Sequence, residues 1–182
     1  MRRPYFVAGD RLLGFNAKAG SSSLVREIIR RYYPEHESGL TFGDNVRHHG
    51  CVDKLSEPDR PVVVVLRDPV QRFLSAMVQT GPDDVAAVID ELQTEAGLVE
   101  SHEGGGLLSE DVHFLPQSRF TGQLKYFPIS RIADAAAELG VRRPLRLNAS
   151  DPARRPAITQ DQAEAVRNYY AADVALWRQV KA

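Results

Sequence analysis

The feature that most constrains the fold is an unbroken apolar run, P-V-V-V-V-L, at residues 61–66. β-Branched residues without polar alternation are typical of a central strand that is buried on both faces of a parallel sheet. The run ends in R-D-P at 67–69, and apolar residues then recur at helical spacing from 70 to 77. Proline suits the first turn of a helix. The sequence therefore predicts a strand, a turn and a helix in series, as in α/β proteins.

A second strand-turn-helix unit precedes this one. The segment R-L-L-G-F at 11–15 has the length of a strand, and apolar residues recur at helical spacing from 24 to 29. The polar stretch between them therefore lies at the start of a helix. Backbone N–H groups at a helix start have no partner within the helix, and the helix dipole is positive there. Such a junction is suited to binding a phosphate or sulfate group.

The residues at this junction are of the types that an anion site needs. Gly20 lets the backbone approach a ligand closely, and Lys18 adds a mobile positive charge. Hydroxyls that supply hydrogen-bond donors and a helix cap follow at Ser21, Ser22 and Ser23. Serines are also common at ordinary helix starts, so the same residues fit a capped helix beside a surface lysine.

The order of these residues separates two kinds of phosphate loop. The Walker A loop has its lysine after the second glycine, whereas here the lysine comes first, in K-A-G-S-S at 18–22. This order resembles the 5'-phosphosulfate loop of sulfotransferases, which use the donor 3'-phosphoadenosine 5'-phosphosulfate (PAPS) and often carry P-K-x-G-[ST]-[ST]. Ala17 stands where the family usually has proline. The resemblance implies that Lys18, Ala19 and the glycine and serines after them bind the donor.

The string R-D-P-V-Q-R-F-L-S at 67–75 resembles a second motif of that family, in which an arginine and a serine eight positions later bind the ribose 3'-phosphate. Arg67 and Ser75 occupy those two positions. Arg72 matches a further recurrent arginine, for which an ion pair with Asp68 is an equal alternative. The two motifs stand in the expected order, and each follows a predicted strand.

Later segments resemble the carbohydrate-type (family 2) sulfotransferases. The segment D-V-H-F-L-P-Q at 111–117 is similar to their H-[FW]-x-P-Q sequence, and 167–177 is similar to their closing helix, to which we assign a packing role. Sulfotransferases commonly hold the 3'-phosphate and adenine with a late basic loop. The resemblance implies this role for Arg154 or Arg155, although surface arginines fit these positions equally well.

The chain of 182 residues, of which 43% are hydrophobic, is long enough for one domain with a buried core and too short for two ordinary ones. We therefore predict a single domain over residues 1–182. The resemblance implies a P-loop-like, three-layer α/β/α fold with a central parallel sheet of about four to five strands. Further predicted elements are strands at 125–130 and 144–148 and helices at 22–33, 83–95, 131–139 and 160–180.

Charge and cysteine content exclude several classes of protein. A net charge of -1 and a pI near 6.5 argue against a general nucleic-acid binder. The single cysteine, Cys51, excludes an internal disulfide and a multi-cysteine metal site. No apolar run approaches the roughly 18 residues of a membrane span, and the N-terminal segment is unlike a signal peptide. We therefore expect a cytoplasmic protein with no membrane partner.

Sulfuryl transfer depends on positioning and charge stabilisation, because the group moves between in-line oxygens. The resemblance implies that Lys18 neutralises charge on the leaving phosphate oxygen of the product, adenosine 3',5'-bisphosphate (PAP), without a metal. The acceptor hydroxyl or amine must lose a proton, and histidine is suited to take it. His48 and His49 lie 19 and 18 residues before Arg67, as a base histidine often does in related enzymes, and His113 is the main alternative.

Two other functions fit parts of the sequence. A P-loop-type nucleotide kinase would share the fold, although no acidic residue directly follows the 61–66 run, and a non-catalytic module would bind PAP without a usable base. The acceptor would be a saccharide, another small molecule or a tyrosine. Residues 73–118 hold nine acids and no lysine or arginine, which fits either a solvated face or an entrance that favours a neutral or cationic acceptor. The sequence does not constrain the oligomeric state.

Overall fold

The structure is a computed structural model, and it describes residues 3–16, 18–36, 52–55, 58–80, 84–94, 114–144 and 152–181. The chain divides into two compact units that alternate along the sequence. The sheet unit consists of residues 2–66 and 120–148, and the helical unit consists mainly of residues 67–119 and 149–182. The single domain expected from the chain length stays a prediction.

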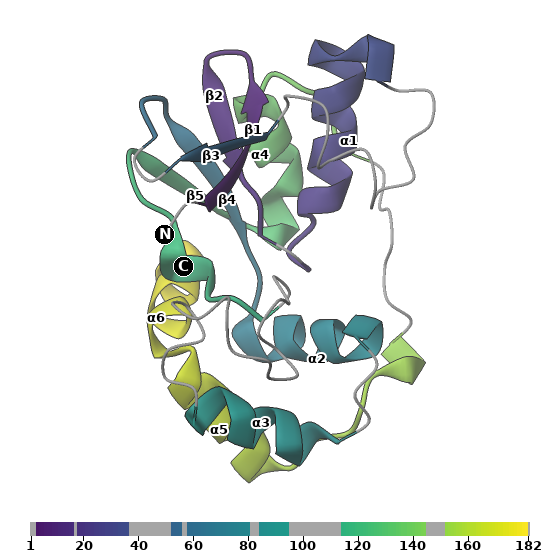
Figure 1. The fold of residues 1–182 in the computed structure, drawn as a ribbon, viewed down its shortest axis with the longest axis vertical. Helices are drawn as coiled ribbons and strands as arrows, with labels where there is room; N and C mark the ends of the chain where they lie inside the picture. Colours follow the sequence, from purple (N-terminus) through teal and green to yellow (C-terminus); the bar gives the residue numbers. More distant parts are fainter. Residues whose placement is uncertain are drawn as a thin grey trace. The chain divides into compact units, whose positions relative to one another are not determined.

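The sheet unit contains five described strands in the order β3-β1-β2-β4-β5 (Figure 1). Their bounds are Arg3–Ala8 (β1), Arg11–Gly14 (β2), Val52–Leu55 (β3), Val62–Leu66 (β4) and Leu124–Pro128 (β5). β2, β4 and β5 are parallel, whereas β1 is antiparallel to both β2 and β3. The α/β class is therefore confirmed, but the expectation of an all-parallel sheet is wrong.

The antiparallel part of the sheet arises from a tight hairpin between β1, which is not among the predicted strands, and β2, which matches the strand predicted at 11–15. Ala8 pairs with Arg11, so β1 and β2 are joined by the two-residue turn Gly9-Asp10. Gly9 has φ 62°, which suits the first position of a primed hairpin turn. A chain that reverses in two residues can only form antiparallel neighbours, and this makes the sheet mixed.

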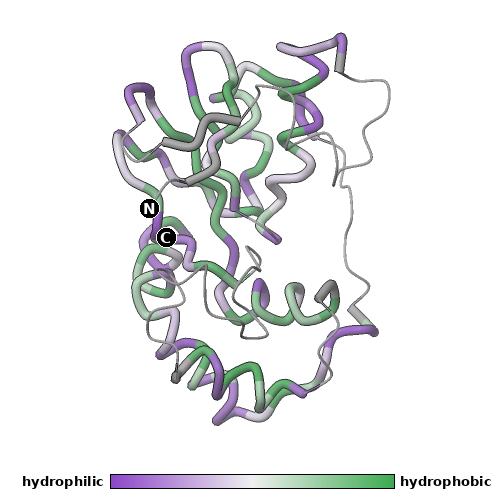
Figure 2. Tube along the Cα trace, viewed as in Figure 1, coloured by the Kyte–Doolittle hydropathy of each residue, from purple (hydrophilic) through white to green (hydrophobic). Residues whose placement is uncertain are grey.

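Two helices of the sheet unit, α1 (Ser21–Tyr32) and α4 (Ile132–Glu138), pack against the same sheet face. Figure 1 shows them side by side. Alternate strand residues point to that face, and they form one buried core with both helices. β4 is buried along its whole length and is hydrophobic throughout in Figure 2, as the 61–66 run predicts. Short 3-10 turns lie at Pro34–His36 and Ile129–Arg131.

The helical unit consists of α2 (Pro69–Thr80), α3 (Val85–Thr94), α5 (Gln160–Tyr169) and α6 (Ala171–Lys181), with 3-10 turns at Gln117–Arg119 and Pro152–Arg154. Apolar residues of α2, α3 and α5 form a second buried core together with Phe114 and Tyr170. None of the helices in the described ranges is long and apolar enough to cross a membrane.

The helix expected at 160–180 is in fact two helices that meet at Tyr170. Tyr170 is 2% exposed, and its hydroxyl donates a hydrogen bond to the carbonyl oxygen of Phe114 at 2.5 Å. Burial raises the pKa of this phenol well above its ordinary value. Of the strand predicted at 144–148, Pro144 lies outside any strand, and residues 145–148 lie outside the described residues.

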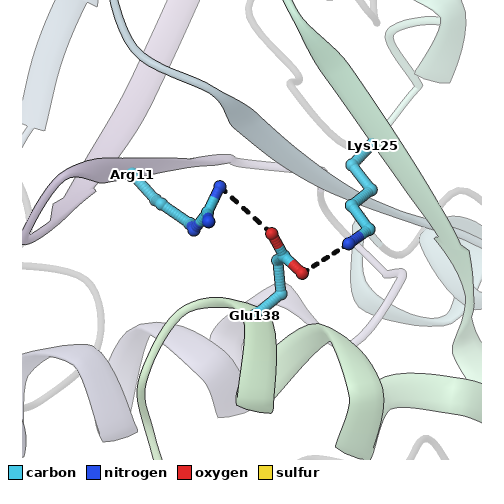
Figure 3. Close-up of polar contacts among 3 residues, drawn as sticks. All are labelled: Arg11, Lys125 and Glu138. Carbon is cyan, nitrogen blue, oxygen red and sulfur yellow. Dashed lines mark hydrogen bonds and ion pairs between the residues drawn. The ribbon is translucent and has the colours of Figure 1, made fainter.

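One ion-pair cluster joins α4 to two strands of the sheet. The carboxylate of Glu138 contacts Arg11 on β2 at 3.0 Å and Lys125 on β5 at 2.5 Å (Figure 3). The Glu138 side chain is 18% exposed. The hydrogen bond from Lys125 is the main cause that lowers the pKa of Glu138 below its ordinary value of 4.5, and Arg11 acts in the same direction.

We predict that Glu138→Gln lowers the free energy of unfolding by roughly 1 kcal/mol at pH 7. A carboxyl group whose pKa is lower in the folded state stabilises the protein above its unfolded pKa, and this contribution is lost as the pH falls through the folded pKa. The difference between wild type and variant should therefore disappear as the pH falls below about 4.5, as urea unfolding at several pH values would measure.

Asp134→Asn is the matched control, because it removes an exposed ion pair with Arg131 on the same helix. We expect it to change the unfolding free energy by at most about 0.5 kcal/mol. A Glu138→Gln effect that stays constant down to pH 3 would show that the pair adds no pH-dependent stability.

Candidate functional site

The predicted anion loop leaves β2 and turns sharply before α1. The N–H of Ala19 donates to the carbonyl oxygen of Asn16 at 3.3 Å, which closes the turn. Lys18, inside that turn, has φ 64°. A non-glycine residue in the left-handed region costs roughly 1–2 kcal/mol. Strain of this kind is concentrated at functional sites in proteins, so it supports a ligand-binding role for Lys18.

Two buried side chains fix the loop in place. The hydroxyl of Ser21 donates to the carbonyl oxygen of Asn16 at 2.7 Å and accepts from the Asn16 N–H at 3.1 Å. The side-chain amide of Asn16 donates to the carbonyl oxygen of Val65 on β4 at 2.9 Å. Ser21 is 1% exposed. Its hydroxyl therefore holds the loop together, and Ser22 is the more accessible hydroxyl of the pair for a ligand.

The start of α1 differs from what the sequence predicts. Its N-cap is Gly20, with no side-chain hydrogen bond, and its first turn contains no acid. The expected serine cap is therefore wrong. By contrast, α2, α3 and α5 begin with side-chain caps from Asp68, Asp84 and Thr159. An anion at the start of α1 would meet backbone N–H groups and the positive end of the helix dipole without a competing carboxylate.

Ala19 and Gly20 also have roles in packing. Ala19 is fully buried in the core of the sheet unit, so only its backbone remains for a ligand. A Cβ atom at Gly20 would lie 2.7 Å from Cδ1 of Ile132, and Gly20 has φ 82°. Glycine is thus favoured here by its left-handed backbone conformation, and a larger residue would also displace the end of the Ile132 side chain. Ser23 is 5% exposed and belongs to the buried side of α1.

In the helical unit, the structure brings together the two residues of the predicted 3'-phosphate motif. Arg67 lies just after β4, and its Nη1 atom donates to Oγ of Ser75 on α2 at 2.9 Å. Ser75 is 1% exposed, whereas Arg67 is half-buried. The buried hydroxyl therefore orients the guanidinium group of a half-buried arginine. A guanidinium group held in this way is suited to bidentate binding of a phosphate.

The backbone of Arg67 is held by a buried amide that the sequence analysis gives no role. The side chain of Gln117 accepts from the Arg67 N–H at 2.9 Å and donates to the Arg67 carbonyl oxygen at 2.8 Å. Gln117 is fully buried. Because both backbone groups of Arg67 are bound by one side chain, the peptide unit has little freedom to rotate.

Asp173 of α6 holds Gln117 in turn. Its carboxylate accepts from the N–H groups of Gln117 and Ser118, each at 2.7 Å, although Asp173 is only 1% exposed. Hydrogen bonds from backbone N–H groups are what make a buried carboxylate tolerable. The series Asp173, Gln117, Arg67 and Ser75 forms a continuous polar network, which we call the arginine clamp.

Of the two late arginines, Arg155 lies beside α2. Its Nη1 donates to Oε1 of Gln71 at 2.8 Å. Gln71 and Ser75 are four positions apart on α2, so they share one helix face. The Nε atom of Arg155 is buried without a hydrogen-bond partner in the described structure. Arg155 therefore lies on the α2 face that carries Ser75 and is half-buried, whereas Arg154 is exposed.

Arg72 has a structural role instead of a ligand-binding one. It is 1% exposed, and its Nη2 donates to the carbonyl oxygen of Leu115 at 2.7 Å. The carboxylate of Asp68 accepts from the N–H of Gln71 and caps α2. The candidate bases His48, His49 and His113, like Ala17, lie outside the described residues.

Comparison with known proteins adds no relative. No protein-family model, no curated protein and no solved structure matches the chain. The function must therefore be inferred from the residues and from their geometry.

We predict that Asp173→Asn lowers the free energy of unfolding by roughly 1.5–3 kcal/mol, because asparagine leaves one backbone N–H facing an amide donor. Urea unfolding followed by circular dichroism would measure the change. The control is Glu164→Gln on α5, which breaks only an exposed ion pair with Arg167 and should cost about 0.3 kcal/mol. Similar losses in the two variants would show that the arginine clamp contributes no more than a surface pair.

Proposed function

We propose that the chain is a PAPS-dependent sulfotransferase with a P-loop-like α/β/α architecture. The observation that carries the proposal is the 2.9 Å hydrogen bond between Arg67 and Ser75, the two residues that the 3'-phosphate motif requires to act together. The spacing of eight residues could arise by chance in any helix. A buried serine that orients an arginine at the end of a strand is a much more specific arrangement.

The 5' end of the donor would bind at the start of α1. The uncapped N–H groups there, with the hydroxyl of Ser22, would hold the 5'-phosphate, and Lys18 would approach the bridging oxygen. The carboxyl ends of β2 and β4 lie at the same sheet edge, because these strands are parallel. In open α/β sheets, ligands bind outside the carboxyl ends of the strands.

The 3' end would bind at the arginine clamp. Arg67 would bind the 3'-phosphate, and Arg155 would supply a second guanidinium group from the same side of α2. Lys18 belongs to the sheet unit and Arg67 to the helical unit.

Bound PAPS would supply an activated sulfuryl group. Transfer forms a bond between the acceptor oxygen and sulfur and breaks the bond between sulfur and the phosphate oxygen, and the acceptor proton passes to a base. Lys18 would stabilise the charge that develops on the leaving oxygen. One of His48, His49 and His113 would be the base. The acceptor that we propose is a saccharide or another small molecule.

We predict that Lys18→Ala lowers the rate of sulfuryl transfer about 100-fold to 1,000-fold while it weakens PAP binding less than about tenfold. The lysine acts mainly on charge that is present only in the transition state. Transfer from labelled PAPS and calorimetric titration with PAP would measure the two effects. The control is Lys18→Gly, which removes the charge and relieves the left-handed backbone, and it should be as inactive as the alanine variant. Equal losses of rate and affinity would exclude the role in stabilising the leaving group.

We predict that Arg67→Ala weakens PAP binding by about 10-fold to 100-fold, toward the affinity of wild type for adenosine 5'-monophosphate. The affinity of the variant for the 5'-monophosphate should be unchanged, because that ligand has no 3'-phosphate. The exposed Arg178 on α6 offers the control Arg178→Ala, which should leave both affinities unchanged. If Arg67→Ala lowers the affinity for both nucleotides equally, Arg67 supports the fold and does not bind the 3'-phosphate.

Binding of PAP by the wild-type protein without any transfer of label from PAPS would identify a non-catalytic module.

A further inference from the structure

A groove on the sheet unit lies apart from the anion loop. It is formed by the C-terminal part of α1 and by the segment that follows α4, and its volume is about 700 Å³. This volume is typical of sites for small molecules. The lining residues are Glu27, Arg30, Arg31, Gly140, Val141 and Arg142.

The groove has an excess of positive charge. Among the lining residues that the structure describes, three are arginines and Glu27 supplies the one carboxylate. That carboxylate is bound to Arg30 at 2.8 Å. Within the described part of the chain, no carboxylate pairs with Arg31 or Arg142, which are both exposed. Guanidinium groups that share a groove repel one another unless an anion lies between them.

Complementing the helix dipole accounts for only part of this cluster. Arg30 and Arg31 lie in the last turn of α1, where cations interact favourably with the helix dipole. Arg142 comes 111 positions after Arg31 in the sequence and lies in a different segment. Arg142 adds a positive charge near the C-terminal end of α1, where Arg30 and Arg31 already interact with the helix dipole. The fold thus joins two basic segments that are far apart in the sequence.

The two walls of the groove are fixed to each other. The hydroxyl of Tyr32, the last residue of α1, donates to the carbonyl oxygen of Leu139 at 3.0 Å. A Cβ atom at Gly140 would lie 2.7 Å from that same hydroxyl oxygen, so the backbone approaches Tyr32 closely. Tyr32 and Val141 also pack against the core of the sheet unit. The groove is therefore preformed, which lowers the ordering cost of binding.

We propose that this groove binds a compact ligand that carries two or more phosphate or sulfate ester groups. Arginine binds such groups in a bidentate manner, and Arg31 and Arg142 have guanidinium groups to offer from opposite walls. Arg30 and Arg31 lie roughly 14 Å along α1 from its start, at a rise of 1.5 Å per residue. The site is thus distinct from the proposed nucleotide site, and the proposal does not depend on the sulfotransferase function.

The test is calorimetric titration with two probes of the same shape, myo-inositol hexakisphosphate and myo-inositol hexasulfate, in the presence of excess PAP. We expect Arg31→Ala/Arg142→Ala to weaken binding of the preferred probe at least about tenfold. The control Arg178→Ala/Lys181→Ala removes two exposed charges from α6 and should change the affinity less than about twofold. Arg31→Lys/Arg142→Lys keeps the charge and should give intermediate binding, because lysine lacks the planar donor pair.

The preferred probe would identify the ester, phosphate or sulfate, that the groove recognises. Equal weakening in the two alanine double variants would mean that the probes respond to net charge alone, and this would overturn the proposal. It would also be overturned if neither probe binds at 1 mM, or if raising the PAP concentration displaces the bound probe.

Discussion

The predicted donor loop depends on one hydrogen bond between a side chain and a strand. The side-chain amide of Asn16 donates to the carbonyl oxygen of Val65. The backbone N–H and the backbone carbonyl oxygen of Asn16 both form hydrogen bonds with the hydroxyl of Ser21. The loop is thereby attached to β4, which is buried along its whole length, and α1 begins from a fixed point. Without this attachment, Lys18 would be a charged residue on a free turn. With it, the strained backbone at Lys18 is maintained by the rest of the unit.

The parts of the fold that the sequence predicts are those with local causes. β4 follows from its unbroken run of valines, and the end of α1 follows from Pro34. The hairpin of β1 and β2 also had a local signal, the turn residues Gly9-Asp10 between two apolar segments. The break at Tyr170 could not be predicted, because it depends on burial against Phe114, which is 56 positions away.

The candidate site shows the same division. Arg67 and Ser75 are selected by a motif within one strand-turn-helix unit, and the structure joins them by a hydrogen bond. Their binding of a phosphate stays a prediction. Gln117 bonds to Arg67 across 50 positions of sequence, and Asp173 bonds to Gln117 across 56 positions. Contacts between residues so far apart cannot be predicted from sequence spacing. A weak signal did exist, since Asp173 lies on the apolar side of its helix, three positions from the buried Tyr170. A buried acid in such a place needs donors from elsewhere in the fold.

The contact between Gly20 and Ile132 has a consequence for how this protein can change over generations. Ile132 stands 112 positions after Gly20 and has no chemical function, yet its Cδ1 atom occupies the space that any larger residue at position 20 would need. The two positions are therefore expected to co-vary. A larger residue at 20 would need Ile132 to move or to be replaced by a smaller residue, and it would also have to adopt the left-handed backbone at φ 82°.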